Sequence, residues 1–397
     1  MDAQIFLIQL VVILISARLL GELAAYFKIP PVIGELLAGI ILGPSLFGWI
    51  EPTHSIQLLA EIGVILLLFE VGQETDISRL VSAGTKALVV ALVGVLAPFL
   101  LGYLISSSLF GLSTLQSFFI GSTLTATSIG ITLRVLRDLK KQNSHEAQII
   151  LGAAVIDDII GIILLAMLYE FATSGGVDYV NSAKAFLYIV LFFILSPIAA
   201  KAISFLIQRW EKKSEIPGLL PSSIVALILF FAWLSHEMGA PALLGGFAAG
   251  LALSSQFFPT KEQKQFSHQV EESMKPIIHL FSPIFFVTIG LSLNLKTIDW
   301  GSSFIWGLTG LLLLAAIFGK WIAGYFLWKE PLITKTIIGT AMVPRGEVGL
   351  IFANIGLTTA IIKEDIYASL ILVIAVTTLL APLCLRYLYG TEKPETS

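Results

Sequence analysis

The sequence predicts an all-α polytopic membrane protein with about thirteen transmembrane helices, inverted repeats and two broken helices. The first basis is composition. Of 397 residues, 56% are hydrophobic and only 13% are charged, which is too little polar surface for a soluble globule. The second is a succession of apolar runs along the chain, and the third is an interruption near the middle of two of them.

Apolar runs of about 18 residues or more define the expected spans, because that length crosses the hydrocarbon core of a bilayer. An acid and no basic segment precede the first run, so it is predicted to be a span and not a cleaved signal peptide. A transmembrane unit, 1–390, is thus expected before a short tail, 391–397. The spans lie near residues 4–27, 31–49, 55–73, 84–107, 116–137, 147–171, 183–208, 219–237, 240–258, 272–293, 301–328, 332–360 and 365–388.

The basic residues predict the orientation of these spans. An odd number of spans places the two termini on opposite sides. When the loops are counted alternately, most lysines and arginines fall on one side, and only Lys184, Lys296 and Lys363 fall on the other. The positive-inside rule then places the N-terminus outside and the C-terminus in the cytoplasm of a bacterial inner membrane.

The reactive residue types give no sign of enzymatic chemistry. The single cysteine, Cys384, excludes an internal disulfide framework and a multi-cysteine metal site. The five histidines lack metal-ligand spacing, and no phosphate-binding loop or nucleophile motif has a plausible setting. We therefore expect a protein of the lipid bilayer that is not an enzyme, needs no cofactor and binds no nucleic acid.

Two of the expected spans are interrupted. The fifth contains GSTLTATSIGIT, residues 121–132, and the twelfth contains AMVPRGEVG, residues 341–349. Pro344 removes a helix hydrogen bond in the second stretch. The two spans are seven apart in order and so cross the membrane in opposite directions. Paired interruptions in two halves indicate an inverted-repeat transporter with its site at the midplane.

Two adjacent carboxylates, Asp157 and Asp158, lie in the apolar stretch LGAAVIDDIIGII, residues 151–163. A carboxylate at mid-membrane costs roughly 2.5 to 3.5 kcal/mol even on the lower scales, so the pair must face protein or water and serve a function. Adjacent helical residues point about 100° apart, which predicts different roles for the two. The alternative, an acidic pair at the membrane surface, would require a helix end within this apolar run.

Two basic residues, Lys320 and Arg345, are also expected within the membrane. About ten apolar or small residues flank Lys320 on each side, so it is predicted to pair with Asp157 or Asp158. A neutral lysine, or one in a water-filled vestibule, is the alternative. Arg345 stays charged when buried, and Glu347 is its expected partner in an ion pair that is structural and not part of ion transport.

Oxygen ligands for a small cation are expected at the first interruption. Carbonyls freed where a helix unwinds, together with hydroxyls, coordinate alkali cations. Thr127 and Ser128 are the candidates, and helix packing is the alternative role of such residues. Glu35, Glu70 and Glu74 could line an access route, but we do not expect them to be ligands.

Several stretches, taken in order, resemble the monovalent cation:proton antiporter-2 family, and most closely its NapA-type sodium/proton antiporters, from about residue 10 to 388. They are PPVIGELLAGIILGPS, LLLFEVGQETD, TATSIGIT, LGAAVIDDIIGI, SPIFFVTIGL, FGKWIAG and VPRGEVGLI. The resemblance implies an NhaA/NapA-like fold with two crossed, partly unwound helices, and it implies a homodimer. Each protomer would have a dimerisation domain, approximately 1–50 and 183–258, and a mobile core domain, approximately 55–171 and 272–388.

The resemblance also implies the roles of individual residues. Asp158 would carry the ion, Asp157 would pair with Lys320, and a Na⁺ site would include Asp158, Asp157 and Thr127. Members of the potassium-efflux branch carry a glutamine at the position of Asp157 and a large cytosolic nucleotide-binding domain. Neither feature is seen in this sequence, which favours sodium exchange.

The expected function is therefore secondary active antiport, with Na⁺ or Li⁺ exported in exchange for H⁺ by elevator-type alternating access. If Lys320 also releases a proton, transport is electrogenic. Salt tolerance and pH homeostasis are the expected uses. A potassium/proton or mixed cation exchanger is the main alternative. An organic-solute symporter with a similar crossed-helix fold, or a channel, would belong to another class.

Overall fold

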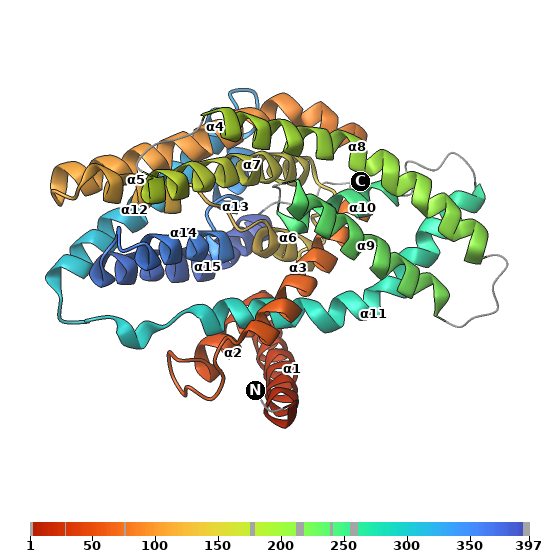
Figure 1. The fold of residues 1–397 in the computed structure, drawn as a ribbon, viewed down its shortest axis with the longest axis horizontal. Coiled ribbons are helices and arrows are strands. Elements are labelled where there is room, and N and C mark those ends of the chain that lie inside the picture. The colour runs from red at the N-terminus through yellow and green to blue at the C-terminus, as the bar shows by residue number, and fades with distance from the viewer. Residues whose placement is uncertain are drawn as a thin grey trace. The chain divides into compact units, whose positions relative to one another are not determined.

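The chain is almost entirely helical. The computed structural model describes residues 3–27, 29–74, 77–174, 179–211, 218–238, 241–254 and 261–391, and no β-strand occurs among them. Figure 1 shows the helices, which are α1 (Ala3–Tyr26), α2 (Pro31–Leu42), α3 (His54–Glu74), α4 (Ile77–Leu104), the π-helical η1 (Ile105–Leu109), α5 (Thr114–Thr123), α6 (Ile129–Asp138), α7 (His145–Ser174), α8 (Tyr179–Glu211), α9 (Leu219–Glu237), α10 (Ala242–Ala252), α11 (Lys261–Ser292), the 3-10 helix η3 (Leu295–Thr297), α12 (Ser303–Tyr325), α13 (Leu332–Ala341), α14 (Gly346–Thr358) and α15 (Glu364–Thr391).

The order of helices matches the predicted spans. Counting α5 with α6 and α13 with α14, and leaving out η1 and η3, the α-helices form thirteen segments. Two segments are much shorter than predicted, because α2 has 12 residues and α10 has 11. The helix α11 begins at Lys261, well before the predicted start near residue 272, so a hydrophilic stretch extends the helix beyond the apolar span.

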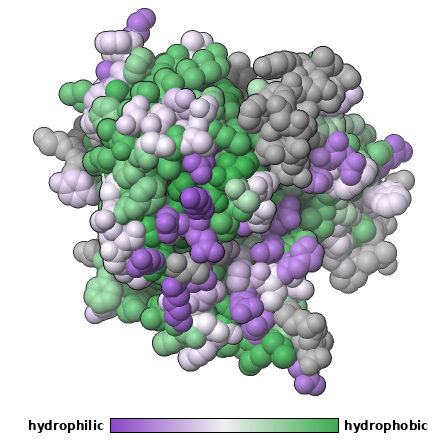
Figure 2. Space-filling view, turned by 60° about the vertical axis from the view of Figure 1, so that its left-hand side comes forward, coloured by the Kyte–Doolittle hydropathy of each residue, from purple (hydrophilic) through white to green (hydrophobic). Residues whose placement is uncertain are grey.

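The described helices have the surface of a membrane protein. Seven of them are long and apolar enough to cross a bilayer by length and composition. Large apolar side chains stay exposed on outer helices, as with Leu19 of α1 and Leu314 of α12, both 65% exposed. Figure 2 shows broad hydrophobic areas on the face turned to the viewer. Exposed apolar side chains on helices of this length are expected where lipid covers them, and the chain is a multi-pass membrane protein.

Contacts divide the chain into two compact units. The first comprises residues 1–52, 82–178 and 286–397, and the second comprises residues 53–81 and 179–285. The second unit has its own apolar core, which includes Phe69 and Phe231. The predicted division into a dimerisation domain and a core domain concerns function, and it stays a prediction.

The first unit holds the candidate site. One of its apolar clusters includes Phe119 of α5, Leu312 of α12, Phe352 of α14 and Val373 of α15. Close helix packing adds to this core. A Cβ on Gly339 of α13 would collide with the main chain of Trp321 on α12, so these helices approach as only small residues allow. The helix α13, which is the first half of the second broken helix, is therefore packed tightly against α12.

Candidate ion-binding site

Two interrupted helices meet at the candidate site. The chain leaves α5 at Thr123 and resumes as α6 at Ile129, and it leaves α13 at Ala341 and resumes as α14 at Gly346. Both breaks fall inside the stretches that the sequence predicted. A proline accounts for the second break, and a run of hydroxyl residues accompanies the first.

Hydrogen bonds join the two breaks directly. The Ser128 amide donates to the Pro344 carbonyl at 2.8 Å, and the Thr127 hydroxyl donates to the Met342 carbonyl at 3.3 Å. Both side chains are buried, with 2% exposure for Thr127 and 0% for Ser128. The structure therefore brings Thr127 and Ser128 to the crossing point, where helices α5 and α13 end and helices α6 and α14 begin.

This crossing can hold charges of either sign. Aligned peptide dipoles give the C-terminal ends of α5 and α13 a partial negative charge and the N-terminal ends of α6 and α14 a partial positive charge. Freed carbonyls favour a cation, and freed amides favour a carboxylate. A site for an alkali cation and a carboxylate fits this arrangement.

Arg345 lies fully buried at the second break. Its Nη1 donates to the Ala126 carbonyl at 3.0 Å, and its Nη2 donates to the Ala316 carbonyl at 2.8 Å. Main-chain acceptors of the first break and of α12 thus bind the guanidinium. The sequence predicted Glu347 as its partner, but the side chain of Glu347 lies outside the part that the structure describes. Sequence reasoning missed the main-chain acceptors because any residue type can supply them.

Lys320 and Asp157 form a buried two-point contact. The Nζ of Lys320 lies 3.0 Å from Oδ1 and 3.1 Å from Oδ2 of Asp157, across 163 residues of sequence. The side chains are 0% and 1% exposed. The sequence left Asp157 and Asp158 open as partners of this lysine, and the structure places Asp157 against it.

Asp158 follows on the same helix and is 6% exposed. Lys320 interacts electrostatically with Asp157, Arg345 and Asp158. When all four groups are ionised, two positive and two negative charges balance. A further positive charge, either a cation or a proton, therefore changes the net charge of this cluster by the same amount.

Gly346 fixes the geometry of the second break. Its φ is +49°, and a Cβ on it would lie 2.5 Å from Cβ and Oγ of Ser128. Left-handed backbone is unfavourable for residues with a Cβ, and the neighbouring Ser128 leaves no space for one. This glycine allows the two breaks to touch.

The acidic residues considered for an access route have different settings. Glu35 of α2 is buried and pairs with Arg134 of α6, with 3.3 Å between Oε1 and Nη2. Glu70 is buried in α3, which belongs to the other compact unit. The side chain of Glu74 lies outside the described part. The contact of Glu35 with Arg134 spans 99 residues and has no sequence motif of its own.

A second ionic cluster joins three elements away from the aspartates. Glu330 precedes α13, and its Oε1 lies 2.6 Å from Nζ of Lys86 on α4 and 3.2 Å from Nε2 of His145 on α7. Burial acts to raise the pKa of Glu330, but the hydrogen bonds from Lys86 and His145 outweigh it, so the pKa lies below its usual value. The cluster connects the first residue of the aspartate helix to the loop after the lysine helix.

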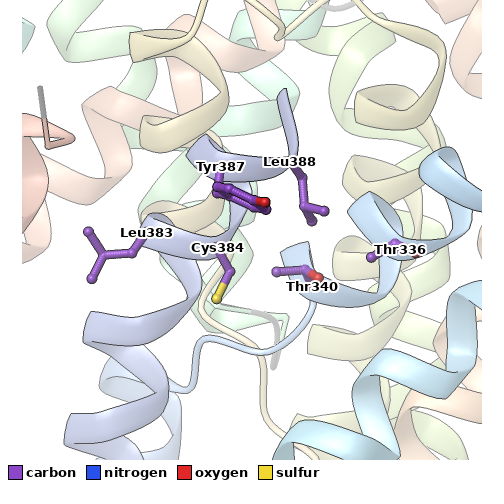
Figure 3. Close-up of a pocket in the computed structure, with 6 residues that line it drawn as sticks. All are labelled: Thr336, Thr340, Leu383, Cys384, Tyr387 and Leu388. Atoms are coloured by element: carbon purple, nitrogen blue, oxygen red, sulfur yellow. The ribbon is translucent and has the colours of Figure 1, made fainter. Parts of the chain in front are cut away.

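A cavity of about 390 Å³ lies between α13 and α15 (Figure 3). It is open to the surface and contains none of the predicted site residues. Its lining is apolar apart from hydroxyl groups and a thiol, so it lacks the carboxylates that cation exchange requires. The lining residues are Thr336, Thr340, Leu383, Cys384, Tyr387 and Leu388.

Crossed broken helices with buried charges at their crossing are characteristic of secondary transporters. Residues 10–389 match the family described as sodium/hydrogen exchanger, transmembrane, and the chain belongs to this family. The predicted family resemblance and the predicted fold class are thereby confirmed.

Individual relatives cover nearly the whole chain. It is 35% identical over 389 residues to the Na(+)/H(+)-K(+) antiporter GerN of Bacillus cereus, covering 98% of this chain and 97% of GerN. It is 33% identical over 432 residues to the high-affinity Na(+)/H(+) antiporter NhaS3 of Synechocystis sp., covering 98% and 91%. Among solved structures, the sodium proton antiporter MjNhaP1 of Methanocaldococcus jannaschii shares the fold, with a TM-score of 0.70, 18% identity and coverage of 98% and 99%.

Proposed function

We propose that this protein is a sodium/proton antiporter and that Asp158 is the carboxylate that binds either ion. The single observation that carries this proposal is the buried contact between Lys320 and Asp157. It engages the first aspartate with a lysine in the membrane interior. The second aspartate, about 100° away around the helix, takes the role of the exchanging group. The names of the antiporter relatives support the same activity.

Competition for one carboxylate couples the two fluxes. A proton and Na⁺ carry the same charge, so either ion neutralises the Asp158 carboxylate. Movement of the bare carboxylate through an apolar barrier is costly, so the site crosses only when loaded. Na⁺ therefore leaves on one side of the membrane only when a proton takes its place.

The hydroxyl and carbonyl oxygens at the crossing would complete the Na⁺ site. Thr127 donates its hydroxyl proton to the Met342 carbonyl, and the lone pairs of its oxygen can still accept a cation. Ser128 offers a second hydroxyl on the next residue. Together with Asp158 and Asp157, these are hard oxygen ligands of the kind that small cations prefer.

Lys320 decides the stoichiometry in this proposal. If the lysine keeps its proton through the cycle, one proton exchanges for one Na⁺ and no net charge moves. If Na⁺ binding draws Asp157 away from Lys320, the lysine loses its partner and releases a proton, so two protons move per Na⁺. Each net charge is worth about 2.3 kcal/mol per 100 mV, so only the second scheme responds to membrane potential. We propose the second scheme.

Potassium exchange is the second candidate. The name of the GerN antiporter includes K⁺, and the chain is 35% identical to it over nearly its full length. Carboxylate, hydroxyl and carbonyl oxygens bind both alkali cations, so the ligand types at the crossing do not separate them. Lithium, which is smaller, is expected to follow sodium.

The larger arrangement is proposed as follows. The protein forms a homodimer in a bacterial inner membrane, with its N-terminus outside and its C-terminus in the cytoplasm. A core domain, approximately 55–171 and 272–388, moves as an elevator against a dimerisation domain, approximately 1–50 and 183–258. The excess of basic residues on one side of the spans supports the orientation.

Reconstitution with an internal pH dye tests the proposed activity. Liposomes containing the purified protein receive a proton gradient and then Na⁺, Li⁺ or K⁺, with and without a clamped membrane potential. We expect Na⁺ and Li⁺ to dissipate the gradient at a rate that the clamp changes. Dissipation of the gradient by K⁺ at a rate that the clamp does not change would favour electroneutral potassium exchange. Single-channel currents would identify a channel, and uptake of an organic solute independent of the aspartates would identify a symporter.

A further inference from the structure

Arg134 connects three helices at the far end of the broken segment. It lies on α6, and its Nη2 is 3.3 Å from Oε1 of Glu35 on α2. Its Nε is 3.2 Å from Oδ1 of Asp138, one turn further along α6. Its guanidinium carbon lies 5.7 Å from the centroid of the Phe286 ring on α11. One guanidinium therefore has a carboxylate partner on its own helix and another on a different helix.

The two carboxylates, Glu35 and Asp138, differ in burial and therefore in how strongly they depend on Arg134 for charge compensation. The side chain of Glu35 is 3% exposed and that of Asp138 is 20% exposed. Oε2 of Glu35 has no hydrogen-bond partner among the described residues. Arg18 of α1 adds a favourable electrostatic interaction with Glu35. When the guanidinium moves away, a buried carboxylate is left as an uncompensated charge, which is costly. A partly exposed carboxylate is instead hydrated.

The two helices are anchored to different surroundings. A Cβ on Gly34 of α2 would collide with the carbonyl of Leu20 on α1. Such a contact leaves α2 little freedom to slide along α1, which the proposed division also places in the dimerisation domain. In contrast, α6 is bonded to the second broken helix, because the Thr132 hydroxyl donates to the Ala341 carbonyl at 2.6 Å.

We propose that the ion pair between Glu35 and Arg134 is a latch of the transport cycle, closed in this conformation and released whenever α6 moves with the ion site. This inference rests on the proposed alternating access, in which α2 belongs to the dimerisation domain and α6 to the core. Asp138 moves with Arg134 and keeps it paired after release, whereas Glu35 stays on α2. The ion pair between Glu35 and Arg134 therefore stabilises one conformation of the transport cycle, and its release controls the conformational change.

A reversible cross-link tests whether the latch must open. In a Cys384→Ser background, which removes the only native cysteine, Glu35→Cys and Arg134→Cys are joined by a short bifunctional thiol reagent that a reductant cleaves. Residual thiols are counted to establish complete reaction. We expect Na⁺-driven proton flux to fall to background and to return after reduction. Cross-linked protein that transports at the rate of the untreated protein would overturn the latch.

A matched pair within one helix provides the control. Lys275 and Glu271 lie one turn apart on α11, with 2.6 Å between Nζ and Oε1. Cysteines at these two positions undergo the same reaction without joining two helices, so we expect unchanged flux. Inhibition in this control as well would show that the reagent itself stops transport, and the loss at Glu35 and Arg134 would then count against the latch.

A distance measurement covers the case in which the paired-cysteine variant does not transport. Spin labels at Leu37 of α2 and Arg137 of α6 leave Glu35 and Arg134 intact. We expect two distances whose populations change between Na⁺ at high pH and Na⁺-free buffer at low pH. A single distance under both conditions would refute release. Wild-type exchange in the same liposomes separates this outcome from failure of the proposed antiport, because antiport can persist without a latch.

Discussion

The Ser128 amide donates to the Pro344 carbonyl at 2.8 Å, and this bond joins the two broken helices through their main chains. Each break thus satisfies part of the polar backbone that the other exposes. In the low dielectric of a membrane interior, unmade backbone hydrogen bonds cost several kcal/mol each. The crossing is therefore a single structural unit. A substitution that shifts the backbone of one broken helix is expected to shift the other.

Substitution of Gly346 by alanine tests this unit. The new Cβ would lie 2.5 Å from Cβ and Oγ of Ser128, on a residue with φ of +49°. We expect a loss of at least about 1 to 2 kcal/mol from the left-handed backbone, with a further loss from the displaced Ser128. Thermal unfolding in detergent measures this loss. The control is Gly310→Ala on α12, where a Cβ would meet nothing within 4 Å beyond the neighbouring backbone of its own helix, and an equally stable Gly346→Ala variant would contradict the prediction.

Asp158→Asn is expected to abolish exchange, because an amide can neither bind a proton at neutral pH nor balance the charge of Na⁺. The fold should persist, since the amide has nearly the same shape. Proton flux driven by Na⁺ in liposomes and melting of the purified variant are measured together. Exchange at the wild-type rate would remove Asp158 from its proposed role.

Lys320→Gln is expected to keep some exchange and lose its response to an imposed membrane potential. The buried Nζ is then absent, so no second proton moves with the cycle. Sodium-driven proton flux is measured at zero potential and at about 100 mV, where one charge is worth about 2.3 kcal/mol. An unchanged response to potential would show that Lys320 is not the second proton carrier.

Asp157→Asn is expected to destabilise the protein more than the double change to Asn and Gln at Asp157 and Lys320. The single change leaves Lys320, 0% exposed, without its carboxylate, whereas the double change removes both charges. Breaking one side of a buried pair costs roughly 3 to 5 kcal/mol because it leaves an uncompensated buried charge, which the double change avoids. Melting of both variants measures the difference. Equal melting temperatures would indicate that water or another group compensates the lysine.

Glu330→Gln is expected to lower the melting temperature at neutral pH and to have no effect in acid. The folded pKa of Glu330 lies below its usual value, so its stabilisation is present above the unfolded pKa and is lost as pH falls through the folded pKa. The size should stay within about 1 kcal/mol, because Lys86 is 40% exposed.

A pH series of melting curves checks this prediction, with Glu272→Gln as the control. Glu272 is 69% exposed and lies 3.9 Å from His268, so its loss should change little. A deficit for Glu330→Gln that grew as the pH fell would show that the carboxylate is not stabilised in its ionised form.

The fold was largely predictable from sequence because the membrane imposes a simple rule. A helix must be apolar over its span, and departures from that rule, at Pro344 and at Thr127, mark where helices break. The lengths of α2, α10 and α11 were less predictable. The boundary between a helix and a loop at the membrane surface depends on tertiary packing, and hydrophilic residues can continue a helix into water.

The candidate site was predictable in its residue types but not in all of its contacts. Buried charges are rare in membranes, so Asp157, Asp158 and Lys320 stood out. The main-chain partners of Arg345 and the pair of Glu35 with Arg134 were missed. Both depend on segments that are far apart in sequence, and neither carbonyl oxygens nor single charges near span ends form a recognisable pattern.

The distance of 163 residues between Asp157 and Lys320 has a consequence for biosynthesis. Ribosomes make α7 long before α12, so the aspartate helix must leave the translocon while its lysine does not yet exist. Each acid opposes insertion of that helix by roughly 2.5 to 3.5 kcal/mol. The apolar residues of α7 must therefore offset this cost until α12 is made and Lys320 can pair with Asp157.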